Sequence, residues 1–547
     1  MLDAVSAGSV FGAFSRSARA HPQNDFLWLP ASATKGYADG RIVFTYEAAA
    51  AEIEKLRLVY ARAGLGPGHR VAILLDNRPA FFFNWLALNA LGVSVVPINP
   101  DYRREEMAYL LDHSDAVLCI ALAHRLGELT DAAASTGRPL PVLDADKVLA
   151  GIPAVPAVAR VDQPVLSQEA ALLYTSGTTG RPKGCIISNE YCLMMADWYS
   201  TVGGYIKFEP GKTRILTPLP MFHMNAMCCS SMAMLATAGC IIQLDRFHPK
   251  SWWQDVAESG ATIVHYLGVM PAILMQLPDG PYDKTHKVIC GFGSNAEPEH
   301  HLAFEKRFGF PLVEGWAMTE TGAGGTIMCT EEPRHIGTRC FGRPPSYMDV
   351  KLVDEQENSV PHGEPGELLV RRKGANPRSG FFSGYLKDAA ATEEAWRGDF
   401  WHTGDVARFG EDGSLHFVDR RKNVIRRSGE NISPLEVEGV LQRHPAARQL
   451  AITSVRDQTR GEEVIALVVL NDGFAAGKET AESITAWCLE RLAYYKAPGW
   501  VAFVDAIPTT ATLKIQRAEL KKLAETLPGS PGCLDLRPLK KRGSEAA

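Results

Sequence analysis

The stretch Tyr174-Thr-Ser-Gly-Thr-Thr-Gly-Arg-Pro-Lys-Gly184 directly follows an apolar run at positions 170–173. It holds three glycines, four serine or threonine hydroxyls and two cations. Glycines let the backbone approach a ligand closely and take positive φ, so that successive N–H groups form a concave anion site. The hydroxyls can donate to phosphate oxygens, and Lys183 adds a point charge. The stretch therefore predicts a phosphate-binding loop after a buried strand.

This loop differs from the Walker A loop, which places a serine or threonine directly after its lysine so that the hydroxyl can meet magnesium. Here Gly184 follows Lys183. A flexible surface loop is the alternative interpretation. Ordinary loops seldom combine this many donors with two cations directly after a buried strand, so phosphate binding is favoured.

Short β-rich runs alternate with helical runs on both sides of the loop. Residues 71–75 and 93–98 are strand-like, and residues 79–91 between them have a helical pattern. Such alternation predicts parallel sheets covered by helices. From Gly342 the pattern changes to short strands separated by Gly and Pro, and a compact α+β segment follows Asn423. The fold class is therefore α/β, with two parallel-type α/β subdomains and a small β-rich subdomain in a large N-terminal domain, followed by an α+β C-terminal domain.

The composition is that of a globular protein. Of 547 residues, 46% are apolar and 22% are charged, and the net charge of −5 favours neither nucleic acid nor an anionic membrane as partner. The 11 cysteines show no C-x-x-C spacing, which indicates buried reduced thiols rather than disulfides or a zinc site. No secretory signal opens the chain. These features predict a cytoplasmic protein without integral membrane contact.

One apolar stretch, residues 81–98, could suggest a membrane-spanning helix. It contains Asn84, Asn89, Gly92 and Ser94. Polar residues and a glycine at this density favour a buried helix, a turn and a strand instead.

The loop resembles the signature loop of the adenylate-forming superfamily, which comprises acyl- and aryl-CoA synthetases, peptide-synthetase adenylation domains and firefly luciferases. The resemblance extends over about Phe44 to Leu520, with further motifs in the family's order. It implies that the loop is mobile and holds the β- and γ-phosphates of ATP through Thr175, Ser176, Gly177, Thr178, Thr179, Gly180 and Lys183.

Two further motifs concern the acyl and adenine pockets. The segment 218–223, Pro-Leu-Pro-Met-Phe-His, resembles the family's aromatic-histidine motif, which implies that His223 lies near the substrate carboxylate. Taken alone, a histidine before a methionine-rich helix is more often a core residue. The segment 291–298 resembles the loop that meets adenine, against the alternative of a plain strand-to-helix turn. It supplies Gly293, Ser294, Asn295, Ala296, Glu297 and Pro298.

The segment 315–321, Gly-Trp-Ala-Met-Thr-Glu-Thr, resembles the family's Tyr-Gly-x-Thr-Glu motif. The match implies that Trp316 stacks on adenine, Thr319 bonds the α-phosphate and Glu320 ligates Mg²⁺, with Ala317 and Met318 lining the nucleotide site. A carboxylate is a hard oxygen ligand suited to Mg²⁺, and an indole offers a large π-face. Trp316 replaces the usual tyrosine and Ala317 the usual glycine.

Later motifs concern the ribose and the domain junction. Trp401-His-Thr-Gly-Asp405 resembles the motif whose aspartate accepts both ribose hydroxyls, and Arg420 matches the arginine that also contacts ribose. Lys422 stands where the family has its hinge residue. The resemblance thus implies an adenylation domain over residues 1–421 and a mobile C-terminal domain over residues 422–527. The polar, basic tail from residue 528 is expected to be disordered.

The C-terminal domain carries two predicted functional segments. Ser428, Gly429 and Glu430 lie where the family's C-terminal domain approaches the pantetheine, and Lys514 matches the lysine that reaches the α-phosphate and carboxylate during adenylation. Leu513 stands where many members have glycine. Independently of the resemblance, Ser433 with Glu436, a serine three residues before a glutamate, predicts a capping box.

Together these motifs imply an ATP-dependent carboxylic acid–CoA ligase that uses Mg²⁺ and coenzyme A. No phosphopantetheine-carrier signature follows Lys514. Met224-Asn-Ala226 stands where peptide-synthetase domains place an aspartate for the amino group, which disfavours an α-amino acid as substrate. Segments such as Ser251-Trp-Trp253 and Met232-Ala-Met-Leu235 resemble bacterial crotonobetaine/carnitine–CoA ligases. The alternative is a non-catalytic or acyl-AMP-only nucleotide-binding relative on the same fold.

Overall fold

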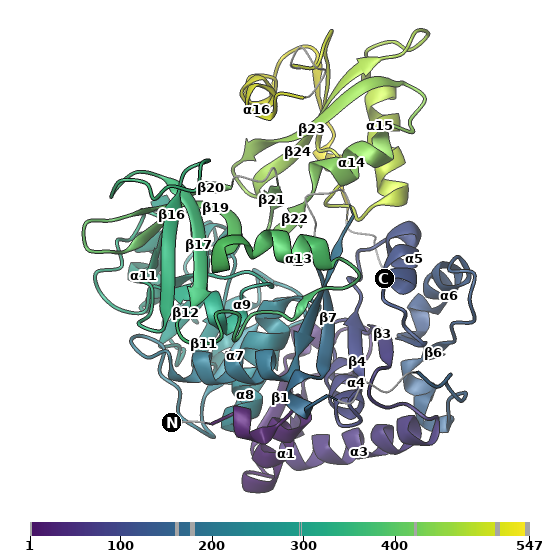
Figure 1. Ribbon diagram of the computed structural model, residues 1–547, viewed down its shortest axis with the longest axis vertical. Helices are drawn as coiled ribbons and strands as arrows, with labels where there is room; N and C mark the ends of the chain where they lie inside the picture. Colours follow the sequence, from purple (N-terminus) through teal and green to yellow (C-terminus); the bar gives the residue numbers. More distant parts are fainter. Residues whose placement is uncertain are drawn as a thin grey trace. The chain divides into compact units, whose positions relative to one another are not determined.

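The computed structural model describes residues 3–158, 163–175, 181–294, 296, 298–420, 424–508 and 515–541. The chain divides into two compact units. Figure 1 shows the chain coloured along its sequence. The first unit comprises residues 1–100, 111–173 and 184–419, and the second comprises residues 101–110, 174–183 and 420–547.

The first unit contains an eight-stranded sheet in the order β14-β13-β12-β11-β9-β10-β1-β2. Its central pairings, from β13 through to β1, are all parallel, and only β2 and β14 at the edges run antiparallel to their neighbours. The strands are β1 (Asp25–Leu29), β2 (Ile42–Thr45), β9 (Arg214–Thr217), β10 (Cys240–Gln243), β11 (Ile263–His265), β12 (Cys290–Gly293), β13 (Leu312–Trp316) and β14 (Ile327–Met328).

A second sheet has seven strands in the order β18-β8-β7-β4-β3-β5-β6. The pairings of β7 with β4, β4 with β3, β3 with β5 and β5 with β6 are parallel. The two parallel-type subdomains predicted from the sequence are therefore confirmed. The strands are β3 (Arg70–Leu74), β4 (Ser94–Pro97), β5 (Leu118–Ala121), β6 (Val142–Asp144), β7 (Glu169–Thr175), β8 (Lys183–Ser188) and β18 (Gly384–Tyr385).

Helix α4 (Pro79–Asn89) lies at the centre of this unit. It begins with a proline in its first turn, where the missing N–H costs no helical hydrogen bond. All but one of its residues are buried, because the helix is apolar on every face. One continuous core joins its Trp85 to Phe26 of β1 and Ile73 of β3, and so to both sheets. A turn at Gly92, whose φ is +72°, leads from α4 into β4. The apolar stretch 81–98 is thus a buried helix, a turn and a strand, as predicted.

Other helices of this unit are α1 (Val10–Ala20), α3 (Tyr46–Arg62), α6 (Leu126–Ala134), α7 (Asn189–Thr201), α8 (Met232–Thr237), α9 (Trp252–Ser259), α10 (Val269–Met275), α11 (Pro298–Phe308) and α13 (Ala389–Ala395). Helix α5 (Arg104–His113) crosses from the second unit into the first. No described helix is long and apolar enough to cross a bilayer. All eleven cysteines lie in the described part of the chain as buried free thiols, as predicted.

A smaller sheet completes the first unit, with the strand order β15-β20-β19-β17-β16. The pairings of β15 with β20, β16 with β17 and β17 with β19 are antiparallel, which confirms the predicted β-rich subdomain. Its strands are β15 (Cys340–Gly342), β16 (Met348–Val353), β17 (Gly366–Arg372), β19 (Trp401–Phe409) and β20 (Leu415–Arg420).

The second unit is the predicted α+β domain. Its sheet follows the order β22-β21-β24-β25-β26, with β23 paired antiparallel to β24. The elements are β21 (Ile425–Arg427), β22 (Glu430–Ile432), α14 (Pro434–Leu441), β23 (Ala447–Asp457), β24 (Gly461–Leu470), α15 (Lys478–Arg491), β25 (Trp500–Phe503), α16 (Arg517–Glu525) and β26 (Cys533–Asp535).

The expectation of a disordered tail from residue 528 is wrong for residues 528–541. Strand β26 pairs antiparallel with β25. Lys540 is buried, where its Nζ donates to the Glu463 carboxylate, and Arg537 donates to Asp457 Oδ2 at 2.9 Å. The basic residues that made the tail look solvated thus neutralise carboxylates of β24 and β23, which fixes this segment to the sheet.

The predicted capping box is also wrong, although α14 does begin at Pro434. The Ser433 hydroxyl makes no cap bond, and Glu436 Oε1 accepts a hydrogen bond from Lys496 Nζ at 2.8 Å. Lys496 is only 2% exposed. A buried ammonium requires a carboxylate partner, so the glutamate is used for charge neutralisation rather than for capping.

Candidate active site

The predicted adenine loop and the Trp316 motif of the first unit lie at the carboxyl ends of adjacent parallel strands, and the aromatic-histidine motif 218–223 follows β9 in the same sheet. β11 ends at His265, β12 at Gly293 and β13 at Trp316. In register, His265 lies beside Phe292 and Gly293 lies beside Glu314. Ligands of open α/β sheets bind outside the carboxyl ends of their strands. The sheet therefore brings the predicted adenine loop and the Trp316 motif to one edge.

The predicted adenine loop starts at a position that admits only glycine. A Cβ on Gly293 would lie 2.3 Å from the carbonyl oxygen of Tyr266, which is far inside van der Waals contact. Ser294 follows, and the amide of Ala296 donates to Glu314 Oε1 at 3.1 Å. The Tyr266 hydroxyl donates to the same carboxylate. Glu314 thus holds the loop against β13. Asn295 and Glu297 lie outside the described residues.

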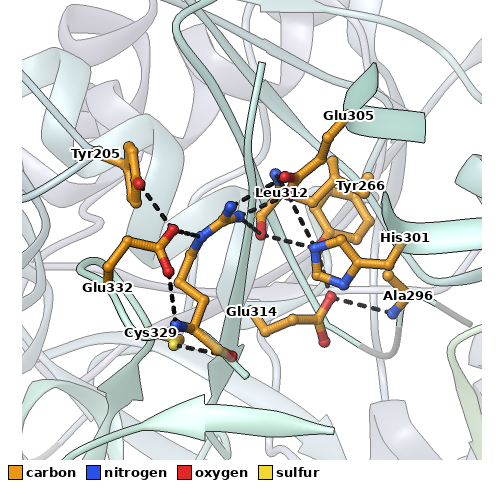
Figure 2. A network of polar contacts seen from close by, with 10 residues as sticks. Tyr205, Tyr266, Ala296, His301, Glu305, Leu312, Glu314, Cys329 and Glu332 are labelled. Atoms are coloured by element: carbon orange, nitrogen blue, oxygen red, sulfur yellow. Dashed lines mark hydrogen bonds and ion pairs between the residues drawn. The ribbon is translucent and has the colours of Figure 1, made fainter. Parts of the chain in front are cut away.

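A buried polar network fixes the helix that follows this loop (Figure 2). Arg334 donates to both oxygens of Glu305, at 2.6 and 2.9 Å, and His301 contacts Glu305 Oε1 through Nε2 at 3.0 Å. The Leu312 amide donates to Glu305 as well, at 2.8 Å. Since His301 and Glu305 belong to α11 and Leu312 opens β13, the network ties α11, which begins at Pro298, to the strand that carries Trp316.

The electrostatics of this network depend on Arg334. Burial alone would raise the pKa of Glu305, but hydrogen bonds from His301, Arg334 and the Leu312 amide outweigh that effect and lower the pKa to about 2. For Arg334, burial would lower the pKa, but hydrogen bonds and charge interactions with Glu305 and Glu332 outweigh that effect and raise it. Glu305 is therefore ionised at neutral pH.

We expect Arg334→Met to destabilise the protein at neutral pH by ~2–3 kcal/mol, because a largely buried carboxylate loses its cationic partner. The pKa of Glu305 is depressed on folding, so its contribution is present above the ordinary carboxyl pKa and is lost as pH falls from about 4.5 toward 2. The difference in urea unfolding between wild type and variant should accordingly shrink from pH 7 to pH 3.

Arg378→Met is the matched control, because Arg378 makes a bidentate pair with Glu393 in which both side chains are exposed. It should change the free energy of unfolding by less than ~0.5 kcal/mol. If the loss in free energy of unfolding caused by Arg334→Met stays constant down to pH 3, the low pKa of Glu305 does not arise from this network.

Trp316 and Asp405, predicted to meet adenine and ribose, are joined directly. The Trp316 indole N–H donates to Asp405 Oδ2 at 2.8 Å, and both side chains are buried. The indole also packs on Phe341, with ring centroids 6.1 Å apart. Ala317, which replaces the family's glycine, is exposed and does not have a positive φ, so an alanine meets no strain there.

Glu320, the predicted metal ligand, is held by a tyrosine. The Tyr385 hydroxyl donates to Glu320 Oε1 at 2.9 Å, and burial together with this carboxylate raises the pKa of Tyr385. Tyr191 donates to the carbonyl oxygen of the preceding Thr319 at 2.9 Å. Tyr385 pairs in register with Cys185, which lies just after Lys183 along β8. The arrangement fixes the Glu320 carboxylate through one oxygen.

Glu320 suits a magnesium ion that is held partly by substrate phosphates rather than one that is enclosed by protein ligands. Among the described residues there is no group of three or more His, Cys, Asp or Glu side chains that could enclose a metal. Mg²⁺ is commonly held by one or two carboxylates together with substrate phosphates. A single, firmly positioned glutamate oxygen suits that mode.

His223 lies in the first unit, where its ring packs on Phe222 with centroids 4.4 Å apart, and the second unit holds several further predicted residues. Thr175 ends β7 and Lys183 opens β8, so they flank the phosphate loop, and the Tyr109 hydroxyl donates to the carbonyl oxygen of Pro182 at 3.0 Å. Ser428 and Gly429 both have positive φ, 51° and 90°, as in a tight hairpin turn. Glu430 follows as the first residue of β22. Ser176–Gly180, Lys422, Lys514 and the side chain of Arg420 lie outside the described residues.

Sequence reasoning missed the tyrosines that support this site. Tyr385 orients Glu320, and Tyr191 anchors Thr319, yet neither belongs to a motif quoted above. The one available signal is the aromatic-rich segment Phe381-Phe-Ser-Gly-Tyr385, in which a glycine separates side chains that pack around Trp401.

Family models and relatives identify the family of the chain. Residues 14–386 match the model described as AMP-binding enzyme, and residues 436–514 match the AMP-binding enzyme C-terminal domain. The chain is 31% identical over 492 residues to crotonobetaine/carnitine–CoA ligase of Citrobacter koseri, covering 87% of this chain and 93% of that protein. It is 31% identical over 520 residues to sulfoacetate–CoA ligase of Cupriavidus necator, covering 91% and 94%.

Solved structures share the fold. An o-succinylbenzoate CoA synthetase of Bacillus subtilis has a TM-score of 0.79 at 23% identity, covering 93% of this chain and 98% of that chain. The amide bond synthetase of Marinactinospora thermotolerans has a TM-score of 0.79 at 25% identity, covering 93% and 99%. With the AMP-binding model matched over residues 14–386, the C-terminal domain model matched over residues 436–514 and 31% identity to a relative covered over 93% of its length, this chain is a member of the AMP-binding enzyme family.

Proposed function

We propose that the protein activates a carboxylic acid with ATP as an acyl-AMP, releasing pyrophosphate, and then transfers the acyl group to the thiol of coenzyme A, releasing AMP. The observation that carries the proposal is the hydrogen bond between Trp316 and Asp405 beside the strand-end adenine loop. It joins an aromatic face for a base to a carboxylate for ribose hydroxyls. The relatives named as CoA ligases support the choice of acceptor.

Nucleoside binding follows from these residues. Trp316 offers its indole face to adenine, while its N–H holds one oxygen of Asp405 in place. The Asp405 carboxylate accepts hydrogen bonds from the ribose hydroxyls, and Arg420 is assigned to the ribose by its place in the motif alone. The loop from Gly293 to Pro298 closes around the adenine. A purine without ribose would therefore bind weakly.

The chemical difficulty of the first step is charge rather than nucleophilicity. A substrate carboxylate, with a pKa near 4, is already ionised at neutral pH and needs no general base. It must instead approach the α-phosphate of an anionic triphosphate. A Mg²⁺ held by Glu320 would supply the positive charge that offsets this repulsion. Thr319 donates to the α-phosphate, and Lys183 and Lys514 stabilise the charge that develops on the displaced pyrophosphate and at the reacting centre.

The second step requires a different set of residues from the C-terminal domain. We infer that the domain rotates about Lys422, so that Lys514 leaves and the turn at Ser428, Gly429 and Glu430 approaches the pantetheine. A single hinge residue can absorb a large backbone change. The positive φ values of Ser428 and Gly429 give a compact turn whose backbone can lie close to the pantetheine of coenzyme A.

ATP–pyrophosphate exchange with a panel of carboxylic acids tests the first half-reaction. We expect one class of acid to support exchange, and CoA added to that acid should give stoichiometric AMP and acyl-CoA. Amines belong in the second assay, because a protein of this fold makes amide bonds. Exchange without thioester formation would identify an acyl-AMP-only enzyme, and nucleotide binding without exchange for any acid would identify a non-catalytic relative.

A further inference from the structure

A buried histidine of the first unit is hydrogen-bonded to a residue that follows the aromatic-histidine motif. His265, the last residue of β11, is fully buried, and its two ring nitrogens have different partners. Nε2 lies 2.7 Å from the Tyr199 hydroxyl, and Nδ1 lies 2.8 Å from Asn225 Oδ1. Tyr199, Asn225 and His265 come from α7, from the start of a π-helix over Asn225–Ser231 and from β11. We call these three residues the relay.

The direction of both hydrogen bonds in the relay follows from Tyr199. Its side chain is fully buried, and His265 Nε2 is the one hydrogen-bond partner that the described residues give its hydroxyl. A buried phenol proton requires an acceptor, so Tyr199 donates and Nε2 accepts. The proton of the neutral imidazole must then be on Nδ1, which donates to Asn225 Oδ1.

The surroundings keep this imidazole neutral. The ring packs edge-on against Phe292 at 5.0 Å and against Tyr199 at 5.6 Å. Burial lowers the pKa of His265 to about 3. The relay is therefore a fixed chain of neutral dipoles at neutral pH, and no proton exchange reverses it there.

The relay fixes which end of the Asn225 amide pairs within the protein and which end has no partner among the described residues. With Oδ1 turned to His265, Nδ2 has no acceptor among the described residues, and it is not one of the fully buried unpaired atoms. Asn225 itself is half-buried. It follows closely after His223 and contacts the last residue of β11, next to the strand that carries the adenine loop. π-helical turns of this kind are frequent at functional sites.

We propose that Asn225 Nδ2 is a hydrogen-bond donor that selects acids whose acyl chain carries a neutral oxygen acceptor, such as a hydroxyl or keto group, over the matching hydrocarbon acid. This inference rests on the proposed function, since it names the substrate class of that same site. A donor held by a neutral relay cannot pair with an ammonium group, so amino-substituted acids are disfavoured. An amide that could rotate freely would give no such selectivity, because its oxygen could serve a donor equally well.

The test compares each oxygenated acid with its deoxygenated counterpart in ATP–pyrophosphate exchange by the full-length protein. The panel contains hexanoate, its hydroxy derivatives at carbons 3 to 6, the 4- and 5-keto acids and 6-aminohexanoate. We expect wild type to prefer at least one oxygenated acid over hexanoate by ~10-fold in kcat/KM, the effect of one hydrogen bond at a partly solvated site. Asn225→Leu, which removes the donor, should reduce this ratio below about 2.

Asn225→Asp provides a second, nearly isosteric variant. One carboxylate oxygen still accepts from His265 Nδ1, while the other presents an acceptor in place of Nδ2. The preference for the oxygenated acid should fall, and the relative kcat/KM for 6-aminohexanoate should rise by ~10-fold. Thermal unfolding of both variants distinguishes a change in specificity from a loss of fold.

The outcomes separate this inference from the proposed function. If no acid supports exchange in wild type, the proposed function fails and the inference with it. If acids support exchange but wild type shows no preference for an oxygenated acid, or if Asn225→Leu and Asn225→Asp keep the wild-type ratio, only the inference is overturned.

Discussion

Lys514→Ala should lower acyl-AMP formation by at least ~100- to 1,000-fold while thioester formation from supplied acyl-AMP stays within about threefold of wild type. Loss of one preorganised group that stabilises developing charge commonly has an effect of this size. Lys514 lies outside the described residues, and its role is inferred from its place in the final motif. The asymmetry arises because the proposed rotation about Lys422 removes this ammonium from the site before the thiol attacks.

Two assays on the same preparation measure the two halves, with pyrophosphate exchange for the first and CoA-dependent AMP release from synthetic acyl-AMP for the second. Lys522→Ala is the matched control, because Lys522 is exposed on α16 and pairs only locally with Glu519. It should leave both rates unchanged. Equal losses in both half-reactions for Lys514→Ala would show that a single arrangement of the C-terminal domain serves both steps.

Local pattern was sufficient to predict the elements that form the framework of the site. The alternation around Ile73 and Trp85 identified two parallel-type sheets, because a strand buried on both faces and a helix apolar on every face each leave an unbroken hydrophobic run. The Gly293 loop and the Trp316 motif were identified by resemblance, and the sheet order explains why they lie side by side.

Contacts between residues distant in sequence could not be predicted in this way. The tail looked disordered because Arg537 and Lys540 are basic. Their partners Asp457 and Glu463, however, lie on strands that are distant from the tail in the sequence. Charge composition alone does not reveal which cations will find a buried carboxylate. Interactions that depend on such partners, including the hold of Tyr385 on Glu320, require the fold itself.

The same limit applies to the relay. Tyr199, Asn225 and His265 come from three separate segments with no shared motif, so the sequence does not indicate that they hydrogen-bond to one another. Its neutral state follows from packing against Phe292 that sequence periodicity does not show. Specificity at this site is thus encoded in tertiary hydrogen bonds rather than in the motifs that identify the family.

Glu320→Gln should lower acyl-AMP formation by ~100-fold or more and raise the Mg²⁺ concentration needed for half-maximal exchange by ~10-fold. The amide retains an oxygen that can accept from Tyr385, as Glu320 Oε1 does at 2.9 Å, so the loop keeps its shape. What it loses is the negative charge that draws a hard divalent cation to the phosphates. The measurement is pyrophosphate exchange over a Mg²⁺ titration at saturating ATP and acid.

Two further variants separate charge from position. Glu331→Gln removes the same charge from an exposed position nearby in sequence and should leave the Mg²⁺ titration unchanged. Tyr385→Phe keeps the Glu320 charge and removes only the hydrogen bond that orients it, so exchange should fall by ~5- to 10-fold with a smaller rise in Mg²⁺ requirement. A Glu320→Gln enzyme that needs no additional Mg²⁺ would show that Glu320 acts through the loop alone and that the cation is held elsewhere. The graded series therefore decides whether the carboxylate binds the metal or only supports Thr319.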